Sequence, residues 1–148
     1  MATTIQNDPA PVFMGEFCHA IDGKNRITIP SSWRFVTELF LIPSTSNPCL
    51  TVMTRTELDR IRAKASTYPG PQRMAVLRHI GSQGHQVELD KAGRLSLPEN
   101  VCKQLKLSGE VTMSGALETF EIWNTDDWKA AHAGTKAVAD ALLPDLGL

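Results

Sequence analysis

Two short segments of the chain place an aspartate four residues before an arginine, with strand-forming apolar residues on both sides. The first is Asp22 with Arg26 and the second is Asp90 with Arg94. The planar guanidinium of arginine can bond a guanine edge or a phosphate with two nitrogens, and a neighbouring aspartate can fix its orientation. These residue types therefore favour recognition of a nucleic acid.

A structural interpretation explains the same spacing. Aspartate side chains accept hydrogen bonds from the amides of tight turns, and the arginine at the start of the next strand can pair with the carboxylate. That pair alone would account for both segments. The two interpretations are compatible, because an arginine held by an aspartate is a better reader of DNA than a mobile one.

The surroundings of both segments repeat along the chain. Residues 21–30 align without gaps on residues 89–98, at an offset of 68, and residues 50–58 resemble residues 120–128 at an offset of 70. Such self-similarity indicates tandem structural units. We predict a flexible N-terminus over 1–12, a first unit over 13–80, a second over 81–132 and an alanine-rich tail over 133–148.

Each unit is predicted to run through a strand, a tight turn, a return strand that ends at a proline, a short helix, two strands and a final helix. Alternation puts Phe17, His19 and Ile21 on the buried face of the first strand. Asn25 and Gly93 hold the same repeat position, and both residue types tolerate a positive φ. We expect helices at 31–38, 73–80 and 99–105, and strands at 39–42, 50–53, 110–113 and 120–123.

Composition excludes several classes of protein. The 148 residues are 42% hydrophobic and 21% charged, which suits one ordinary globular domain. Three cysteines without a C-x-x-C pattern argue against a disulfide framework or a zinc ribbon. The sequence has no apolar run long enough for a membrane helix and no recognisable secretion signal. We therefore expect a cytoplasmic protein with no membrane partner.

The formal net charge of −1 hides a gradient along the chain. Residues 22–106 carry thirteen Lys and Arg against seven Asp and Glu, whereas both ends are acidic. This asymmetry is a reason to test for a polyanionic partner, although ordinary solvated faces explain it equally well.

Enzymatic chemistry is not expected. The chain has no P-loop, no G-x-S-x-G and no H-E-x-x-H pattern. His79 and His85 lack a ligand set of recognisable metal spacing, so no metal, cofactor or small-molecule substrate is predicted. Phe120, Trp123 and Trp128 could stack on single strands, but core or subunit packing is the favoured interpretation.

The repeated block resembles the tandem motif of the MraZ family of bacterial transcriptional regulators, which belong to the AbrB-like class. The resemblance rests on Asp-x-Lys-x-Arg-Ile-Thr-Ile-Pro and Asp-Lys-x-Gly-Arg-Leu-x-Leu-Pro, and extends to Trp33-Arg34 and Glu121-Ile122-Trp123. It implies an α+β, β-rich fold. In that fold the two AbrB-like units form an interlocked, swapped-hairpin, pseudo-dimeric barrel with peripheral helices.

The resemblance also implies a function. Family members assemble as homo-oligomeric rings on repeated double-stranded DNA sites upstream of the cell-division and cell-wall gene cluster, usually as repressors, which implies a nucleoid-associated protein. The residues that match the motif's DNA-facing positions are Asp22, Lys24, Arg26, Asp90, Lys91 and Arg94. Here Asn25 stands where the family usually has Gly, and Cys102 where Arg is frequent. Alternatives are an oligomeric protein–protein scaffold without specific DNA binding and a small-ligand or enzyme domain.

Overall fold

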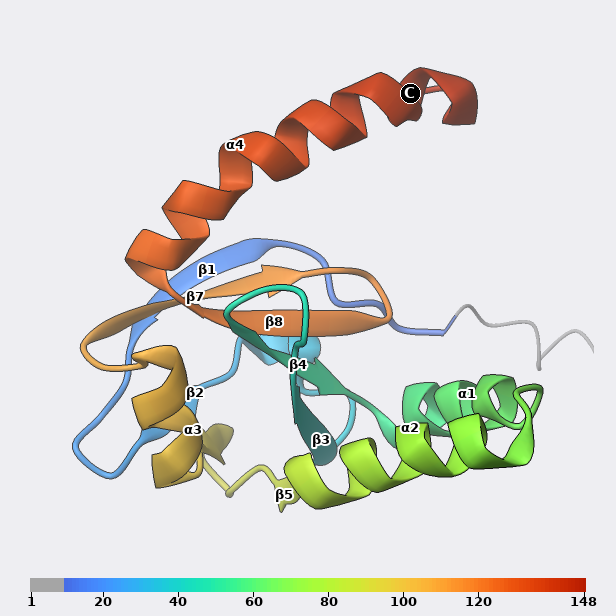
Figure 1. Cartoon of the computed structure of the whole chain (residues 1–148). Coiled ribbons are helices and arrows are strands. Elements are labelled where there is room, and N and C mark those ends of the chain that lie inside the picture. Colours follow the sequence, from blue (N-terminus) through green and yellow to red (C-terminus); the bar gives the residue numbers. More distant parts are fainter. Residues whose placement is uncertain (1–9) are drawn as a thin grey trace, which may run out of the picture.

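Strands from both predicted units share one antiparallel sheet in the computed structural model, which describes residues 10–148 (Figure 1). The six-stranded sheet has the order β1-β7-β8-β4-β3-β5, and β2 pairs with β6 in a separate two-stranded ribbon. Residues 1–9 of the predicted flexible N-terminus lie outside the described part of the chain. The strands are β1 (Glu16–Ala20), β2 (Arg26–Thr28), β3 (Glu38–Pro43), β4 (Cys49–Met53), β5 (His85–Glu88), β6 (Arg94–Ser96), β7 (Glu110–Gly115) and β8 (Thr119–Asn124).

The strand pairs cross the predicted boundary between the repeats. β1 of the first unit pairs with β7 of the second, and β5 of the second pairs with β3 of the first. β4 and β8, one from each unit, pair in the middle of the sheet. Neither unit could therefore keep its own sheet intact without the other.

The predicted fold class is confirmed as α+β and β-rich, but the larger sheet is not a closed barrel. Within residues 10–148, β1 and β5 are its two edge strands and do not pair with each other. The return strands β2 and β6 pair with each other in the separate ribbon, so strand pairing does not continue all the way around the core.

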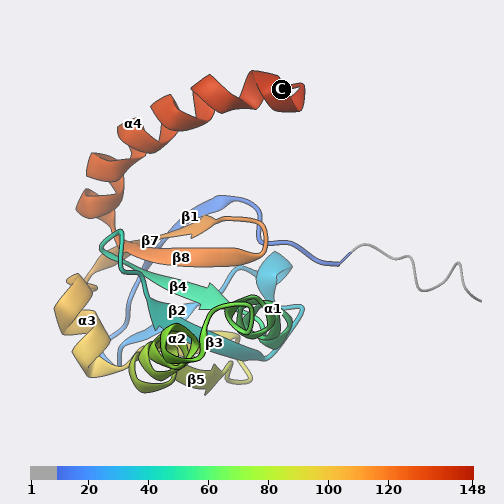
Figure 2. The same cartoon turned by 45° about the vertical axis from the view of Figure 1, so that its right-hand side comes forward.

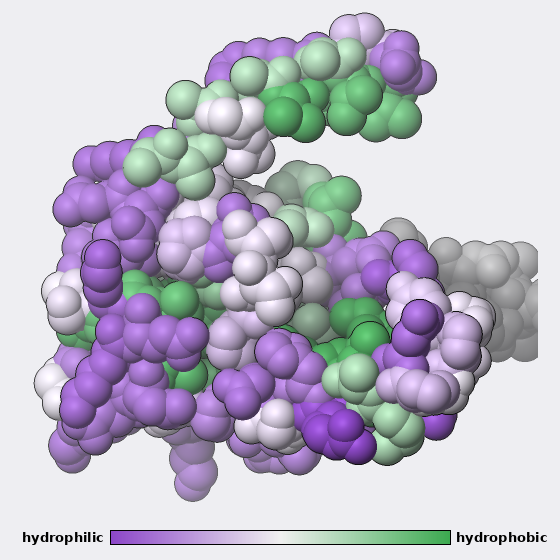
Figure 3. All heavy atoms as spheres, viewed as in Figure 1, coloured by the Kyte–Doolittle hydropathy of each residue, from purple (hydrophilic) through white to green (hydrophobic). Residues whose placement is uncertain are grey.

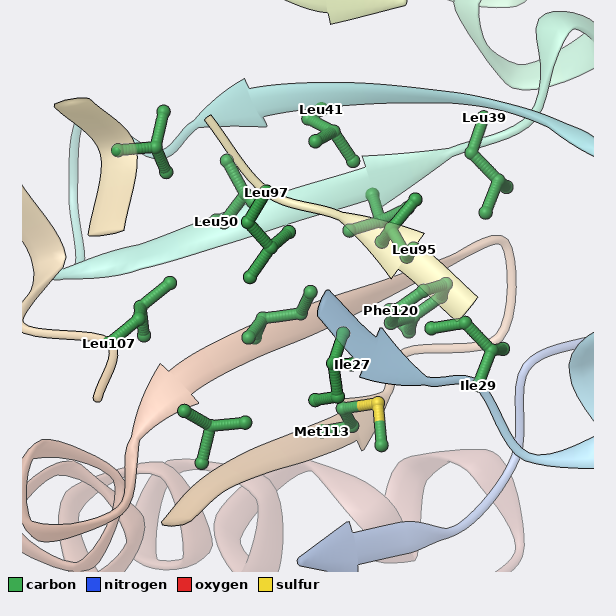
Figure 4. Packing of buried hydrophobic residues seen from close by; sticks show 14 of the residues in the cluster. Ile27, Ile29, Leu39, Leu41, Leu50, Leu95, Leu97, Leu107, Met113 and Phe120 are labelled. Atoms are coloured by element: carbon green, nitrogen blue, oxygen red, sulfur yellow. The ribbon is translucent and has the colours of Figure 1, made fainter. Parts of the chain in front are cut away.

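The hydrophobic core lies between the sheet and the ribbon. Ile27 of β2 and Leu95 of β6 face each other and are fully buried, as are Leu41, Leu50 and Phe120 from the sheet. Figure 4 shows these side chains converging from strands of both units. Apolar burial is the dominant favourable term in folding, so one core stabilises both units together.

Four α-helices surround this core: α1 (Arg55–Ala65), α2 (Gly70–Gln83), α3 (Glu99–Leu105) and α4 (Thr125–Leu142). α1 and α2 lie side by side near β3, whereas α4 runs away from the sheet on the opposite side (Figures 1 and 2). The Asn124 side chain accepts a hydrogen bond from the Asp127 amide at 3.0 Å, so it caps α4. None of the helices within residues 10–148 combines the length and apolarity that a membrane span needs.

The helix expected over 31–38 is wrong. Only a 3₁₀ turn, η2 (Ser31–Trp33), forms there, and β3 begins at Glu38. Trp33 is fully buried, with its ring edge-on to Phe13 and Phe17. Anchoring this side chain and pairing β3 on both edges outweigh the local helix preference. The equivalent helix of the second unit, expected over 99–105, is confirmed as α3.

Other local predictions also needed correction. His19 is exposed on the edge strand β1, although Phe17 and Ile21 on either side of it pack against the core. Thr54 caps α1, two residues before Thr56, whose spacing to Asp59 is the capping pattern in the sequence. The predicted helix over 73–80 extends through Gln83 as α2, which buries no residue and leaves Met74 45% exposed. The predicted alanine-rich tail over 133–148 continues α4 and then folds into a 3₁₀ helix, η3 (Leu143–Leu146).

Truncating the ribbon core tests whether the two units fold together. We expect Leu95→Ala to lower the free energy of unfolding by about 2–5 kcal/mol, because a fully buried leucine in a packed core leaves a cavity. Urea denaturation followed by circular dichroism should show one cooperative transition. Met74→Ala is the control, since Met74 is 45% exposed on α2, and should change the stability by less than about 0.5 kcal/mol. Two separate transitions would contradict a shared core.

Candidate nucleic-acid interface

The first turn is held together by the Asp22 carboxylate. One of its oxygens accepts hydrogen bonds from the backbone amides of Lys24 and Arg26, each at 2.9 Å. The other accepts from Nε of Arg26 at 2.8 Å. The Asp22 amide donates to the Arg26 carbonyl at 2.9 Å, which closes the turn. A single carboxylate thus fixes both the turn backbone and the arginine side chain.

The second turn repeats this geometry. Asp90 accepts from the amides of Ala92 and Arg94 at 2.9 Å each, and from Nε of Arg94 at 2.7 Å. Both expected Asp–Arg pairs are therefore present. Each arginine uses Nε for the pair, and its terminal nitrogens make no hydrogen bond within residues 10–148. Those nitrogens remain available to an external ligand.

The strands on either side of each turn do not pair with each other as a simple hairpin would. β1 joins β7, whereas β2 joins β6. The residue with a positive φ redirects the chain: φ is 59° at Asn25 and 77° at Gly93. Ile29 donates its amide to the Gly93 carbonyl, and Leu97 donates to the Asn25 carbonyl. Each turn is thereby tied to the return strand of the other unit.

The ribbon brings the two arginines together. The register pairs Arg26 with Ser96 and Thr28 with Arg94. Because side chains alternate along a strand, these four lie on one face, opposite the buried Ile27 and Leu95. Diagonal neighbours on one face of an antiparallel pair are about 7–8 Å apart. The ribbon thus presents two guanidinium groups and two hydroxyl groups on one polar face.

The two predicted lysines occupy different places in their turns. Lys24 is two residues after its aspartate, where the second turn has Ala92, and Lys91 is one residue after its aspartate, where the first turn has Gly23. Both side chains are exposed. The turns are therefore alike in backbone and in the Asp–Arg pair, but not in the placement of the additional positive charge.

The turn bonds lower the pKa of both aspartates. For Asp22 the largest cause is the hydrogen bond from the Arg26 backbone amide, with smaller contributions from the Arg26 side chain and the Lys24 amide. The pKa of Asp90 is lowered in the same way, first by the Arg94 backbone amide. Partial desolvation opposes the shift in both cases. Each carboxylate therefore stays ionised well below neutral pH.

A contact missed from the sequence joins the two units at the second turn. Arg34 donates from Nε to the Ile29 carbonyl at 2.7 Å. Its guanidinium lies flat against Gly93, where a Cβ atom would come within 2.4 Å of Arg34 Cζ. The Trp33-Arg34 pair was visible in the sequence, but its contact with a turn about 60 residues later was not, because that contact depends on the cross-unit pairing.

Other candidate groups lie apart from the turns. A groove of about 490 Å³ runs beside α1, lined by Phe13, Phe35 and Val36, with Arg60 between Glu57 and Glu118. Burial raises the pKa of the Cys49 thiol to about 12. Within residues 10–148, no three His, Cys, Asp or Glu side chains converge as a metal site would require.

The aromatic residues weighed as stacking platforms belong mainly to packing. Phe120 and Trp123 are buried, as the favoured interpretation predicted. Trp128, which is partly exposed, packs edge-on against Trp123 and also contacts His132.

The pKa of Asp22 in an arginine variant tests what holds the turn. In Arg26→Ala the backbone amide at position 26 remains, so we expect the pKa to rise only part of the way towards its ordinary value of 3.8. Because the folded-state pKa lies below the unfolded one, the turn bonds stabilise the fold above about pH 4, and this contribution falls away as the pH drops through the lowered pKa. Carboxyl ¹³C NMR titration measures the shift. A full return to 3.8 would mean that the side chain, and not the backbone, holds the carboxylate.

A comparison with known families agrees with this geometry. The model of the family described as "MraZ protein, putative antitoxin-like" matches residues 82–140. The match runs from the end of α2 through most of α4 and includes the Asp90 turn. Residues 21–30 outside it repeat the same motif and build the same turn at Asp22. This match and the repeated turn at Asp22 support membership of the MraZ family.

Proposed function

We propose that this protein is a sequence-specific DNA-binding transcriptional regulator that acts as a repressor. The observation that carries the proposal is the β2–β6 ribbon with Arg26 and Arg94 on its polar face, each oriented by an aspartate that also holds its own turn. The match of residues 82–140 to the MraZ family, which the sequence motif also resembles, supports the same conclusion.

The ribbon has the dimensions and chemistry for a DNA groove. The major groove of B-DNA admits a two-stranded β-ribbon, and an arginine there can bond the O6 and N7 atoms of guanine bidentately. Arg26 and Arg94 supply two such groups, and Thr28 and Ser96 supply hydroxyls beside them. Lys24 and Lys91 extend from the turns, where they can contact phosphates, which set the register without reading sequence.

Few base contacts per chain favour assembly on repeated sites. One ribbon reaches only a short stretch of duplex, so binding by a single chain is weak. We propose that several copies form a ring on repeated sites upstream of the cell-division and cell-wall gene cluster, where linked contacts multiply the affinity. Such a repressor resides with the nucleoid.

The surface has apolar area that self-association could bury. The C-terminal helices α4 and η3 leave three apolar side chains more than half exposed: Val138, Leu142 and Leu146. Figure 3 shows apolar side chains along the side of this helical segment that faces the body of the molecule. The groove beside α1 is a second apolar surface. Large apolar patches on the surface of a folded protein often mark sites where it contacts another protein or another copy of itself.

Equilibrium binding to duplex DNA tests the proposed function. Fluorescence anisotropy would compare DNA from upstream of the gene of this chain with a scrambled duplex, at several salt concentrations. We expect the wild-type protein to prefer the native duplex and to bind more weakly as salt rises. Arg26→Ala and Arg94→Ala should each lose about 1–3 kcal/mol of specific binding energy. Arg62→Ala, which removes one exposed arginine from α1, is the matched control and should bind like the wild type.

Circular dichroism and sedimentation velocity should show that these variants keep the fold and the oligomer of the wild-type protein. Equal binding to both duplexes would mean that the protein binds DNA through its positive surface charge alone and does not recognise a sequence. An oligomer that binds neither duplex at low salt would favour the alternative function, a protein–protein scaffold.

A further inference from the structure

We propose that Arg34 is an additional DNA-phosphate-binding residue, and that it makes the second turn the stronger of the two DNA contacts within one chain. The proposal rests on the proposed function and adds to it a residue outside the Asp–Arg motif. It also states that the two repeats are unequal, although their turns share one backbone geometry.

Arg34 belongs to the first unit but lies on the second turn. Its Nε donates to the Ile29 carbonyl, while the Ile29 amide donates to the Gly93 carbonyl at 2.9 Å. Ile29 therefore connects the Arg34 side chain to the turn through both of its backbone groups. The guanidinium lies against Gly93, next in sequence to Arg94. Within residues 10–148, its terminal nitrogens donate to no protein group.

The corresponding place on the first turn has no arginine. The offset of 68 residues aligns Arg34 with Cys102 and Gly93 with Asn25. Cys102 is buried and lines a depression of about 360 Å³ together with Asn25, Lys103 and Lys106. Lys103 pairs with Glu99 at 3.4 Å, so among the residues that line this depression Lys106 is the one with an uncompensated charge within residues 10–148. The first turn thus has a flexible lysine where the second has a fixed guanidinium.

The residue types at the two turns fit this difference. A Cβ at position 93 would lie 2.4 Å from both Cζ and Nε of Arg34, so Gly93 is required while Arg34 occupies its place. Asn25 carries a Cβ at the same repeat position because its neighbour is the small Cys102. A planar fork held in place binds phosphate oxygens bidentately at a lower cost in side-chain entropy than a mobile lysine. The geometry therefore favours Arg34 as a phosphate contact beside Arg94.

A double-mutant cycle with Gly93 tests the role of Arg34. The proteins are the wild type, Arg34→Gln, Gly93→Asn, the double variant Arg34→Gln/Gly93→Asn, Arg34→Lys, and Arg62→Gln as the control of equal charge change. The probe is the preferred duplex from the anisotropy experiment, titrated at several salt concentrations. Thermal melts of each protein report whether the fold is kept.

We expect Arg34→Gln to raise Kd about tenfold and to reduce the salt slope by about one, as loss of one phosphate contact does. Arg62→Gln should stay within about twofold of wild type. Arg34→Lys should keep most of the salt slope, because the charge remains, but lose part of the affinity. Arg34→Gln should melt as one cooperative unit within a few degrees of wild type, because it loses a single hydrogen bond, to the Ile29 carbonyl.

Gly93→Asn should raise Kd about tenfold when Arg34 is present, because the new Cβ displaces the guanidinium. The same change should cost less than about twofold in the Arg34→Gln background, since asparagine already holds φ of 59° at the first turn. This non-additivity is the signature of two residues acting as one unit.

Two results would overturn the proposal: Arg34→Gln binding like Arg62→Gln, or Gly93→Asn costing the same in both backgrounds. In either case the wild-type protein would still bind DNA, and the proposed function would stand. Absence of wild-type binding to any duplex would instead defeat the proposed function, and the role of Arg34 with it.

Discussion

The pairing of β2 with β6 is the constraint on which the rest of the structure depends. It places one return strand from each repeat side by side, with Ile27 against Leu95 on the buried face. Because both side chains are removed from water only when the strands pair, neither repeat can complete its core alone. The same pairing sends β1 and β5 to opposite edges of the larger sheet. It also carries Arg26 and Arg94 onto one polar face.

The turns divide structural and binding roles between backbone and side chains. Each aspartate carboxylate accepts its hydrogen bonds mainly from backbone amides, so the turn does not depend on the arginine side chain to keep its shape. The arginine contributes one nitrogen to the pair and leaves its terminal nitrogens to a ligand. The structural and functional interpretations of the D-x-x-x-R spacing therefore describe one arrangement. A turn held by its backbone is a rigid support, which limits the entropy that an ordered arginine loses on binding.

The repeats are similar in backbone and different in surface. Asn25 and Gly93 both adopt positive φ, yet only the glycine has an arginine packed against it. The unit boundaries predicted at residue 80 and residue 132 remain predictions. Strands from both sides of the first boundary share one sheet. Gly81, just after the first boundary, lies within α2.

The sequence by itself determined the elements whose signals are local. The two Asp–Arg turns, the positive φ at Asn25 and Gly93, the prolines that end the return strands and the cap at Asn124 depend on residues within a few positions, and all were predictable. Tertiary structure alone decided which strands pair, that only a 3₁₀ turn forms within the expected helix over 31–38, and that His19 is exposed. It alone placed Arg34 on Gly93. The physical reason is that strand pairing and side-chain burial depend on residues far apart in the chain, whose contacts outweigh local preference once a shared core forms.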